Sequence, residues 1–186
     1  MNPSKNPSAL RSKKILTETL LHLMESCPYP EITVKQILLE SGISRKTFYR
    51  NFLSKDDVLN SHIDAIIYEY LETLLIQETY SFLQMLDIIF SFCEHNKDLL
   101  FLLRDNELLY LLLPKLNRLI LTEHKRITRN PSAAALSRYI ILFNIGGIWN
   151  ILSDWIENNM EAKPADIKKV IRHYLQNIEN IDLQTI

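Results

Sequence analysis

Glycine and cysteine are both scarce in this sequence of 186 residues. Only three glycines occur, and none forms the Asn-Gly or Asp-Gly pair that closes many β-hairpins. No segment alternates apolar and polar residues over the length of a strand, so we expect an all-α fold. The two cysteines, Cys27 and Cys93, lie outside any CxxC motif. Neither a structural zinc site nor a disulfide framework is therefore expected, and a reducing cytoplasm fits.

Several other signals are missing. No uninterrupted apolar run reaches the roughly 18 residues that span a bilayer, so no membrane partner is expected. The basic residues near the N-terminus precede no long apolar stretch, which argues against a secretory signal. The histidines lack metal-ligand spacing, and GxSxG, P-loop and dinucleotide motifs are absent. We therefore expect no enzymatic activity, no cofactor and no metal.

Charge is distributed unevenly along the chain. Residues 1–55 hold nine Lys or Arg and four acidic residues, a net +5, and the remaining residues hold 12 and 18, a net -6. A basic N-terminal part on an acidic body indicates that a polyanion binds to the N-terminal part alone. Small local imbalances are common, however, so charge by itself leaves the partner open.

Helix start and stop signals divide the N-terminal part. A helix over about residues 8–26 is ended by the two prolines of the segment 27–30. Thr33 and Gln36 predict a capping box for a second helix, which Gly42 stops. Ser44 caps a third helix that reaches about Phe52, and Ser54 caps a long fourth helix.

Helical periodicity continues through the rest of the chain. Pro114 lies inside one helical pattern and predicts a kink that frees the carbonyl of Tyr110. With the four N-terminal helices, this gives about nine, the later ones at residues 80–95, 97–104, 106–126, 131–158 and 164–180.

The segment from the second to the third helix has the pattern of a helix-turn-helix. Gly42 can adopt the left-handed conformation that the turn needs. The residues expected to fix the angle between the helices are Val34, Ile37, Ile43, Phe48 and Phe52. The third helix then exposes polar residues of which none is acidic, namely Arg45, Lys46, Thr47, Tyr49 and Arg50. A helix this short can enter a major groove about 12 Å wide with its first residues at the base edges.

These motifs resemble a known family. The stretches ITVKQI (32–37), SGISRKTFYRNF (41–52) and SKDDVL (54–59) are similar in residue type and spacing to the signature of the tetracycline-repressor (TetR/AcrR) family. The likeness covers about 50 residues with the first helix included. A weaker likeness, carried by NIGGIW (144–149), DWIEN (154–158) and PADI (164–167), is to a C-terminal domain common among Firmicutes members.

The resemblance implies DNA-binding roles for individual residues. Arg45, Lys46 and Thr47 become the candidates for reading bases, whereas Tyr49 and Lys55 match positions that usually bind phosphate, and Arg50 suits either role. The helix N-terminus at Thr33 is expected to face a phosphate. The full expected set is Thr33, Ser44, Arg45, Lys46, Thr47, Tyr49, Arg50 and Lys55.

Alternatives remain for two of these residues, and the sequence departs from the family pattern at two positions. Tyr49 can instead cover the edge of the core, and Lys55 can be a solvated surface lysine. Ser41 stands where alanine is usual, and Lys46 where a small residue is common. An N-terminal arm over about residues 1–8 either reaches DNA or is a disordered tail.

The helix over 131–158 is apolar around more than one face, which predicts a homodimer. Two adjacent glycines inside it make sense if another backbone packs closely there. We expect a four-helix dimer core from this helix and the next, formed by Ile141, Ile145, Gly146, Ile148, Leu152, Trp155, Ile171 and Tyr174.

A small-molecule effector is implied by the resemblance alone. Ordinary core packing is the competing interpretation for each candidate, since aromatic and Met residues at helical spacing usually form the core. The candidate lining is Phe82, Met85, Phe92, His95, Phe101, Arg104, Tyr110, Phe143, Asn144 and Trp149.

The combined prediction is a cytoplasmic bacterial transcriptional regulator. Residues 1–54 form the DNA-binding domain, and residues 55–186 form a helical domain for regulation and dimerisation. The expected activity is repression of a near-palindromic operator in double-stranded DNA, relieved by an effector. The alternative is a protein of the same fold that acts mainly through a protein partner as a co-regulator.

Overall fold

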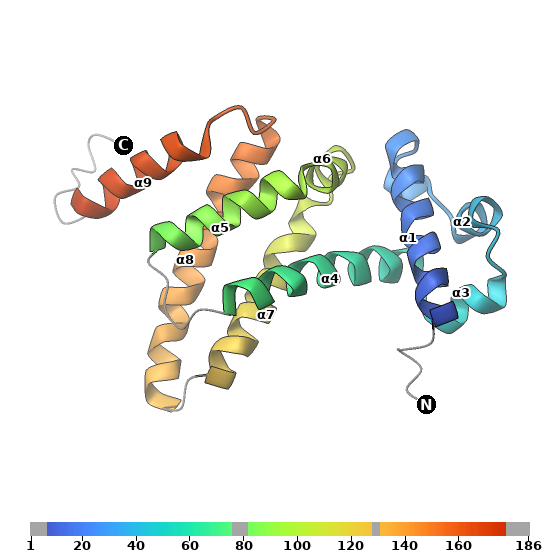
Figure 1. The fold of residues 1–186 in the computed structure, drawn as a ribbon, viewed down its shortest axis with the longest axis horizontal. Coiled ribbons are helices and arrows are strands. Elements are labelled where there is room, and N and C mark those ends of the chain that lie inside the picture. Colours follow the sequence, from blue (N-terminus) through green and yellow to red (C-terminus); the bar gives the residue numbers. More distant parts are fainter. Residues whose placement is uncertain (1–6, 76–81, 128–130, 178–186) are drawn as a thin grey trace. The chain divides into compact units, whose positions relative to one another are not determined.

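Helices make up almost the whole of the structure, a computed structural model that describes residues 7–75, 82–127 and 131–177 (Figure 1). Within these ranges there are nine α-helices and no strand, which confirms the all-α prediction. They are α1 (Pro7–Ser26), α2 (Val34–Ser41), α3 (Arg45–Asn51), α4 (Lys55–Leu75), α5 (Phe82–His95), α6 (Lys97–Asp105), α7 (Leu112–Ile127), α8 (Pro131–Glu157) and α9 (Pro164–Asn177). Two 3-10 turns, Tyr29–Glu31 and Leu109–Leu111, precede α2 and α7.

The chain packs as two compact units. The first combines Met1–Glu69 with Leu102–Arg118, and the second combines Tyr70–Phe101 with Leu119–Ile186. Helices α4, α6 and α7 therefore contribute residues to both units. Packing places the segment from the end of α6 to the start of α7 with the N-terminal helices, which no local pattern in the sequence indicated.

In the first unit, α1 packs on α2 and α3 (Figure 1). Leu16, Leu20 and Met24 lie one turn apart on α1 and are buried, as helical spacing predicts. They form a core with Ile37 of α2 and Phe48 of α3, both fully buried. This core fixes the two short helices against the long first one.

The predicted caps are present at three helix starts. The Thr33 hydroxyl accepts from the N–H of Gln36, and the Gln36 side chain accepts from the N–H of Thr33, which is the expected capping box. The hydroxyl of Ser44 accepts from Thr47, and that of Ser54 accepts from Asp57. Each hydroxyl satisfies a main-chain donor that the helix itself cannot pair.

Gly42 ends α2 in the left-handed conformation, with φ +66°. No heavy atom lies within 4 Å of the position that a Cβ would occupy. The glycine is therefore required by the backbone conformation, not by lack of space.

The predicted continuous helix over 106–126 is wrong, and so is the kink at Pro114. The chain leaves α6 at Asn106 and Glu107, where Glu107 has φ 59°, and then forms the turn Leu109–Leu111. Pro114 lies in the first turn of α7, where a missing N–H breaks no hydrogen bond within the helix. The helical periodicity of the sequence did not reveal this break, because the apolar residues around it, Leu108, Leu109 and Leu112, are all buried.

In the second unit, α5 contacts α8 and α9. The rings of Phe90 and Trp155 meet edge to face with centroids 5.0 Å apart, and the indole N–H of Trp155 donates to the carbonyl of Ala162. Helix α9 packs on α5, and Lys168 forms an ion pair with Asp87. No residue of α9 is buried.

Part of α8 has the length and composition of a membrane-spanning helix. The stretch Ser137–Glu157 has a mean hydropathy of 1.2, and 17% of its most apolar window is buried. Polar residues such as Arg138, Asn144 and Asp154 interrupt this stretch, so it is not one of the uninterrupted apolar runs considered above. Core and interface helices meet the same criterion.

A buried ion pair joins α4 to α7 inside the first unit. The ammonium group of Lys115, whose side chain is 10% exposed, lies 2.7 Å from a carboxylate oxygen of Asp64 and 3.4 Å from the carbonyl of Asn60. Arg118 lies 3.7 Å from the same carboxylate. Removing one partner from such a pair leaves the other charge uncompensated.

We predict that Asp64→Ala lowers the free energy of unfolding by about 3 kcal/mol, because it strands the buried ammonium group. Lys115→Met should cost less than about 1 kcal/mol, since methionine fills the same space and Asp64 keeps Arg118. Urea unfolding measures both. Lys14→Met, which removes an exposed pair with Glu18, is the control and should cost less than about 0.5 kcal/mol. Equal losses for the Asp64 and Lys115 variants would contradict this account.

Candidate nucleic-acid interface

Helix α3 is anchored by one aromatic side chain. Phe48 has no exposed surface. Its ring centroid lies 5.2 Å from that of Tyr49, edge to face, and 6.2 Å from that of Phe52. With Phe48 directed into the core, the opposite face of α3 is turned outward. The orientation of the helix is therefore set by its buried residue.

The outward face carries the polar residues that the sequence predicted. Arg45, Lys46, Tyr49 and Arg50 are all exposed, Thr47 is half-buried, and α3 has no acidic residue. The structure thus brings the expected base-reading and phosphate-binding residues of α3 onto one short helix. Such a surface can bind an anionic partner through several side chains at once.

The hydroxyl groups of the two capping residues are occupied by the fold. Thr33 donates its hydroxyl hydrogen to Gln36, and Ser44 donates its own to the hydroxyl of Thr47 at 2.9 Å. The N–H of Thr33 is also used within the capping box. In this arrangement both residues order the starts of α2 and α3, whether or not DNA is nearby.

Two cation–π contacts restrain basic side chains near α3. The guanidinium carbon of Arg45 lies 5.5 Å from the ring centroid of Tyr49, and the ammonium of Lys13 lies 5.5 Å from that of Phe52. Tyr49 is 45% exposed and contacts Phe48, so it covers the edge of the core while it supports Arg45. Arg45 is thereby held in a preferred direction before any ligand arrives.

Lys55 is engaged by main-chain groups of the first unit. Its ammonium group donates to the carbonyls of Tyr29 at 2.5 Å, Ile32 at 2.7 Å and Pro30 at 3.1 Å. It also lies 4.5 Å from the ring centroid of Tyr29. These contacts use all three of its N–H donors, which departs from the expected phosphate contact.

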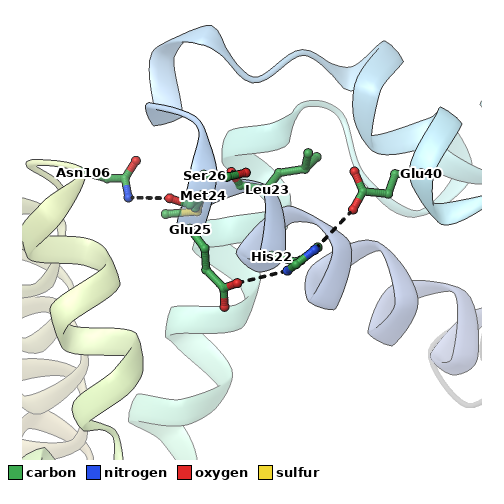
Figure 2. A network of polar contacts seen from close by, with 7 residues as sticks. All are labelled: His22, Leu23, Met24, Glu25, Ser26, Glu40 and Asn106. Atoms are coloured by element: carbon green, nitrogen blue, oxygen red, sulfur yellow. Dashed lines mark hydrogen bonds and ion pairs between the residues drawn. The ribbon is translucent and has the colours of Figure 1, made fainter.

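Tyr29 and Asn106 are structural residues that sequence reasoning missed. The Tyr29 hydroxyl donates to Asp56, and burial together with this carboxylate raises the pKa of Tyr29 well above its usual value. Figure 2 shows the Asn106 amide directed at the carbonyl of Met24, 3.2 Å away. The prolines around Tyr29 predicted the end of the first helix, but nothing in the sequence linked that segment to Asn106.

A second polar contact in Figure 2 joins α1 to α2. The His22 ring lies between Glu25, at 3.0 Å, and Glu40, at 3.9 Å. All three side chains are substantially exposed, so solvent weakens the attraction. The contact adds a surface link between helices that the core already holds.

The predicted effector lining does not form one cluster. Tyr110 is 67% exposed, Phe143 is 74% exposed and His95 is also exposed, so none of these three lines an enclosed space. Arg104 pairs with Asp105 in the first unit. The half-buried candidates in the second unit are Phe82, Met85, Phe92, Phe101, Asn144 and Trp149.

A tyrosine that sequence reasoning missed lies beside one of these candidates. The ring centroid of Tyr70 lies 4.2 Å from that of Phe92, and its buried hydroxyl makes no hydrogen bond of full geometry, although the backbone of Phe92 interacts with it. Burial also raises the pKa of the neighbouring Cys93 to about 12, which keeps its thiol protonated and unreactive. A buried hydroxyl without a well-formed hydrogen bond is uncommon and calls for an explanation.

Four of the predicted dimer residues are core residues of the protomer. Ile145, Ile148, Leu152 and Trp155 are each less than 10% exposed, so a second copy cannot cover them. The expected face of α8 was therefore wrong, because periodicity does not tell which apolar side packs inward. Ile141, Gly146 and Ile171 are half-buried, and Tyr174 is exposed. Among the residues of α8 from Ser137 onward, the large apolar side chains left exposed are Tyr139, Ile140 and Phe143.

Metal chemistry has no candidate site in the described ranges, where no group of three or more His, Cys, Asp or Glu residues lies close enough to hold an ion. Comparison with known proteins adds no assignment: no family model matches the chain, and no curated protein matches it. The case for function therefore depends on the geometry of α3 and its surroundings.

We predict that Ser44→Ala lowers the free energy of unfolding by about 1 kcal/mol, because the N–H of Thr47 loses its acceptor. Ser44→Asp should retain most of the stability, since its carboxylate can cap the same position. Thermal unfolding followed by circular dichroism measures both variants. An equal loss in the two would show that capping is not what Ser44 contributes.

Proposed function

We propose that this protein is a DNA-binding transcriptional regulator of the tetracycline-repressor type. The observation that carries the proposal is helix α3, which is anchored by Phe48 and turns four exposed side chains, two arginines, a lysine and a tyrosine, away from the core. The major groove admits an α-helix, and α3, with seven residues, is short enough to lie in it with its first residues at the base edges.

Within this proposal, the residues of α3 have different roles in binding DNA. Arg45 and Lys46 lie in its first turn, where a recognition helix meets base edges, and Thr47 follows them. Arg50 is in the last turn and suits a phosphate. The ring of Tyr49 packs against the guanidinium group of Arg45, and the Tyr49 hydroxyl binds the DNA backbone.

A homodimer is the second part of the proposal. Helix α8 exposes Ile140 and Phe143, and Gly147 continues the same face with open space above it. Helix α9 has no buried residue and exposes Val170 and Tyr174. Isolated exposed apolar residues are normal, but a whole helix with no buried residue gains little from the protomer alone. A second copy that covers α8 and α9 supplies the missing burial, and its two-fold axis suits a near-palindromic operator.

A small-molecule effector is the third part. The buried hydroxyl of Tyr70, whose ring is tilted against that of Phe92, is a polar group of the second unit without a well-formed hydrogen bond. A ligand that bonds to this hydroxyl would satisfy it, and it would shift the regulator between two states if it bound one more tightly. We therefore propose that the effector binds near Tyr70 and that its binding releases DNA.

Selection of DNA sequences by the purified protein tests the first part. The wild type should enrich a motif with two-fold symmetry. Arg45→Ala should relax the preference at one base pair of each half-site by about 1–3 kcal/mol. Tyr49→Phe, which keeps the aromatic ring under Arg45, should weaken all sequences to a similar extent.

Lys97→Ala serves as the control, because this lysine lies on α6 and outside α3. Its binding should equal that of the wild type. Failure to enrich a symmetric motif would contradict the proposed DNA-binding function. It would favour the alternative, action through a protein partner.

Gel filtration tests the dimer. The wild type should elute at twice the mass of its 21.8 kDa chain, whereas Phe143→Lys should elute as a monomer, because a charge then lies in the apolar contact. Tyr110→Lys is the matched control, since Tyr110 is an aromatic residue of the first unit with a similar exposure, 67% against 74% for Phe143. A Phe143→Lys protein that remained dimeric would contradict the proposed surface.

A further inference from the structure

The turn Tyr29–Glu31 is held by two segments that are far from it in sequence. The N–H of Tyr29 donates to the side-chain oxygen of Asn106 at 2.8 Å, and its carbonyl accepts from Lys55 at 2.5 Å. Its hydroxyl donates to Asp56, also at 2.5 Å. Every polar group of Tyr29 therefore has a partner, and the partners come from the start of α4 and the end of α6.

Lys55 is committed to this turn. The carbonyls of Tyr29, Pro30 and Ile32 all accept from one ammonium group, and that of Tyr29 also accepts from the N–H of Ile32 within the 3-10 turn. To bind a phosphate, Lys55 would have to leave at least one of these carbonyls. The arrangement favours a lysine that stays in the protein.

Asn106 joins the turn to two helix ends. Its amide nitrogen donates to the carbonyls of Met24 in α1 and Leu102 in α6, while its oxygen accepts from Tyr29 (Figure 2 shows the contact with Met24). These groups all belong to the first unit. A single amide thus ties the segment between α6 and α7 to the end of α1.

We propose that Lys55 and Asn106 are positioning residues of the DNA-binding surface, and that neither contacts DNA. Together they hold the turn Tyr29–Glu31, which leads directly into Thr33 and α2. Asn106 also makes the position of this turn depend on the segment between α6 and α7. The DNA part of this inference rests on the proposed function, but the clamp itself concerns the free protein.

A salt titration of DNA binding separates positioning from phosphate contact. The logarithm of the affinity falls with the logarithm of salt concentration, with a slope of about 0.9 per phosphate contact. Lys55→Met should weaken binding several-fold with the wild-type slope, because no phosphate contact is lost. Arg50→Met removes the exposed α3 residue that the proposal assigns to a phosphate, and it calibrates the slope change. A Lys55→Met slope shallower by about 0.9 for each protomer would overturn the proposal.

Amide hydrogen exchange in the free protein tests the clamp without DNA. Asn106→Leu should speed exchange of the Tyr29 N–H by about tenfold, the effect of losing one hydrogen bond. Asn106→Asp keeps an oxygen for this N–H but loses the two donors, so Tyr29 should stay protected. If Asn106→Leu does not fold, Asn106→Asp still tests the clamp by itself. Unchanged exchange at Tyr29 in Asn106→Leu, or equal loss in both variants, would overturn the clamp.

The two residues should also be coupled, because they act on the same turn. The double variant Lys55→Met with Asn106→Leu should lower the urea midpoint by less than the sum of the single variants. Simple additivity would contradict a shared role. A wild type that bound no DNA would refute the proposed function, while the exchange and urea results would still decide whether the clamp exists.

Discussion

The carbonyl groups between α1 and α2 that lie outside any α-helix are the constraint on which the N-terminal unit depends. Pro28 and Pro30 end the first helix, and in the segment that follows, the carbonyl of Tyr29 accepts from the N–H of Ile32 within the 3-10 turn. Lys55 donates to three of these carbonyls. Asn106 accepts from the N–H of Tyr29, and Asp56 accepts from its hydroxyl. Since Lys55 is also the first residue of α4, the same contact that completes the turn fixes where the long helix begins.

The exposed face of α3 depends on this construction. A helix of seven residues is too short to be stable by itself in water. It persists because Phe48 is fully buried and Ser44 caps the first turn, so its exposed residues have almost no structural task. Arg45 and Tyr49 are the exceptions, since Tyr49 covers the edge of the core and Arg45 rests on its ring, which limits the rotamers of Arg45 before binding. The N-terminal unit thus separates the residues that build the surface from those that face a partner.

Local signals in the sequence predicted local structure well. The caps at Thr33, Ser44 and Ser54 and the stop at Gly42 all lie where the chain indicated, because each depends on residues within four positions of one another. The orientation of the polar residues of α3 followed from helical spacing in the same way. The contact between Tyr29 and Asn106 spans 77 positions and had no local signature. Periodicity also failed at α8, where both sides are apolar and only packing against α5 decides which one is buried.

Gly42 shows how narrowly one backbone angle limits the sequences that can build this turn. Its φ of +66° excludes β-branched side chains through the handedness of L-amino acids, although the space beside it is open. Asparagine tolerates this conformation better than other residues with a Cβ, so it is the natural substitute. Sequence drift at position 42 is therefore limited by chirality and not by volume, whereas the neighbouring surface of α3 is free to diversify toward new binding preferences.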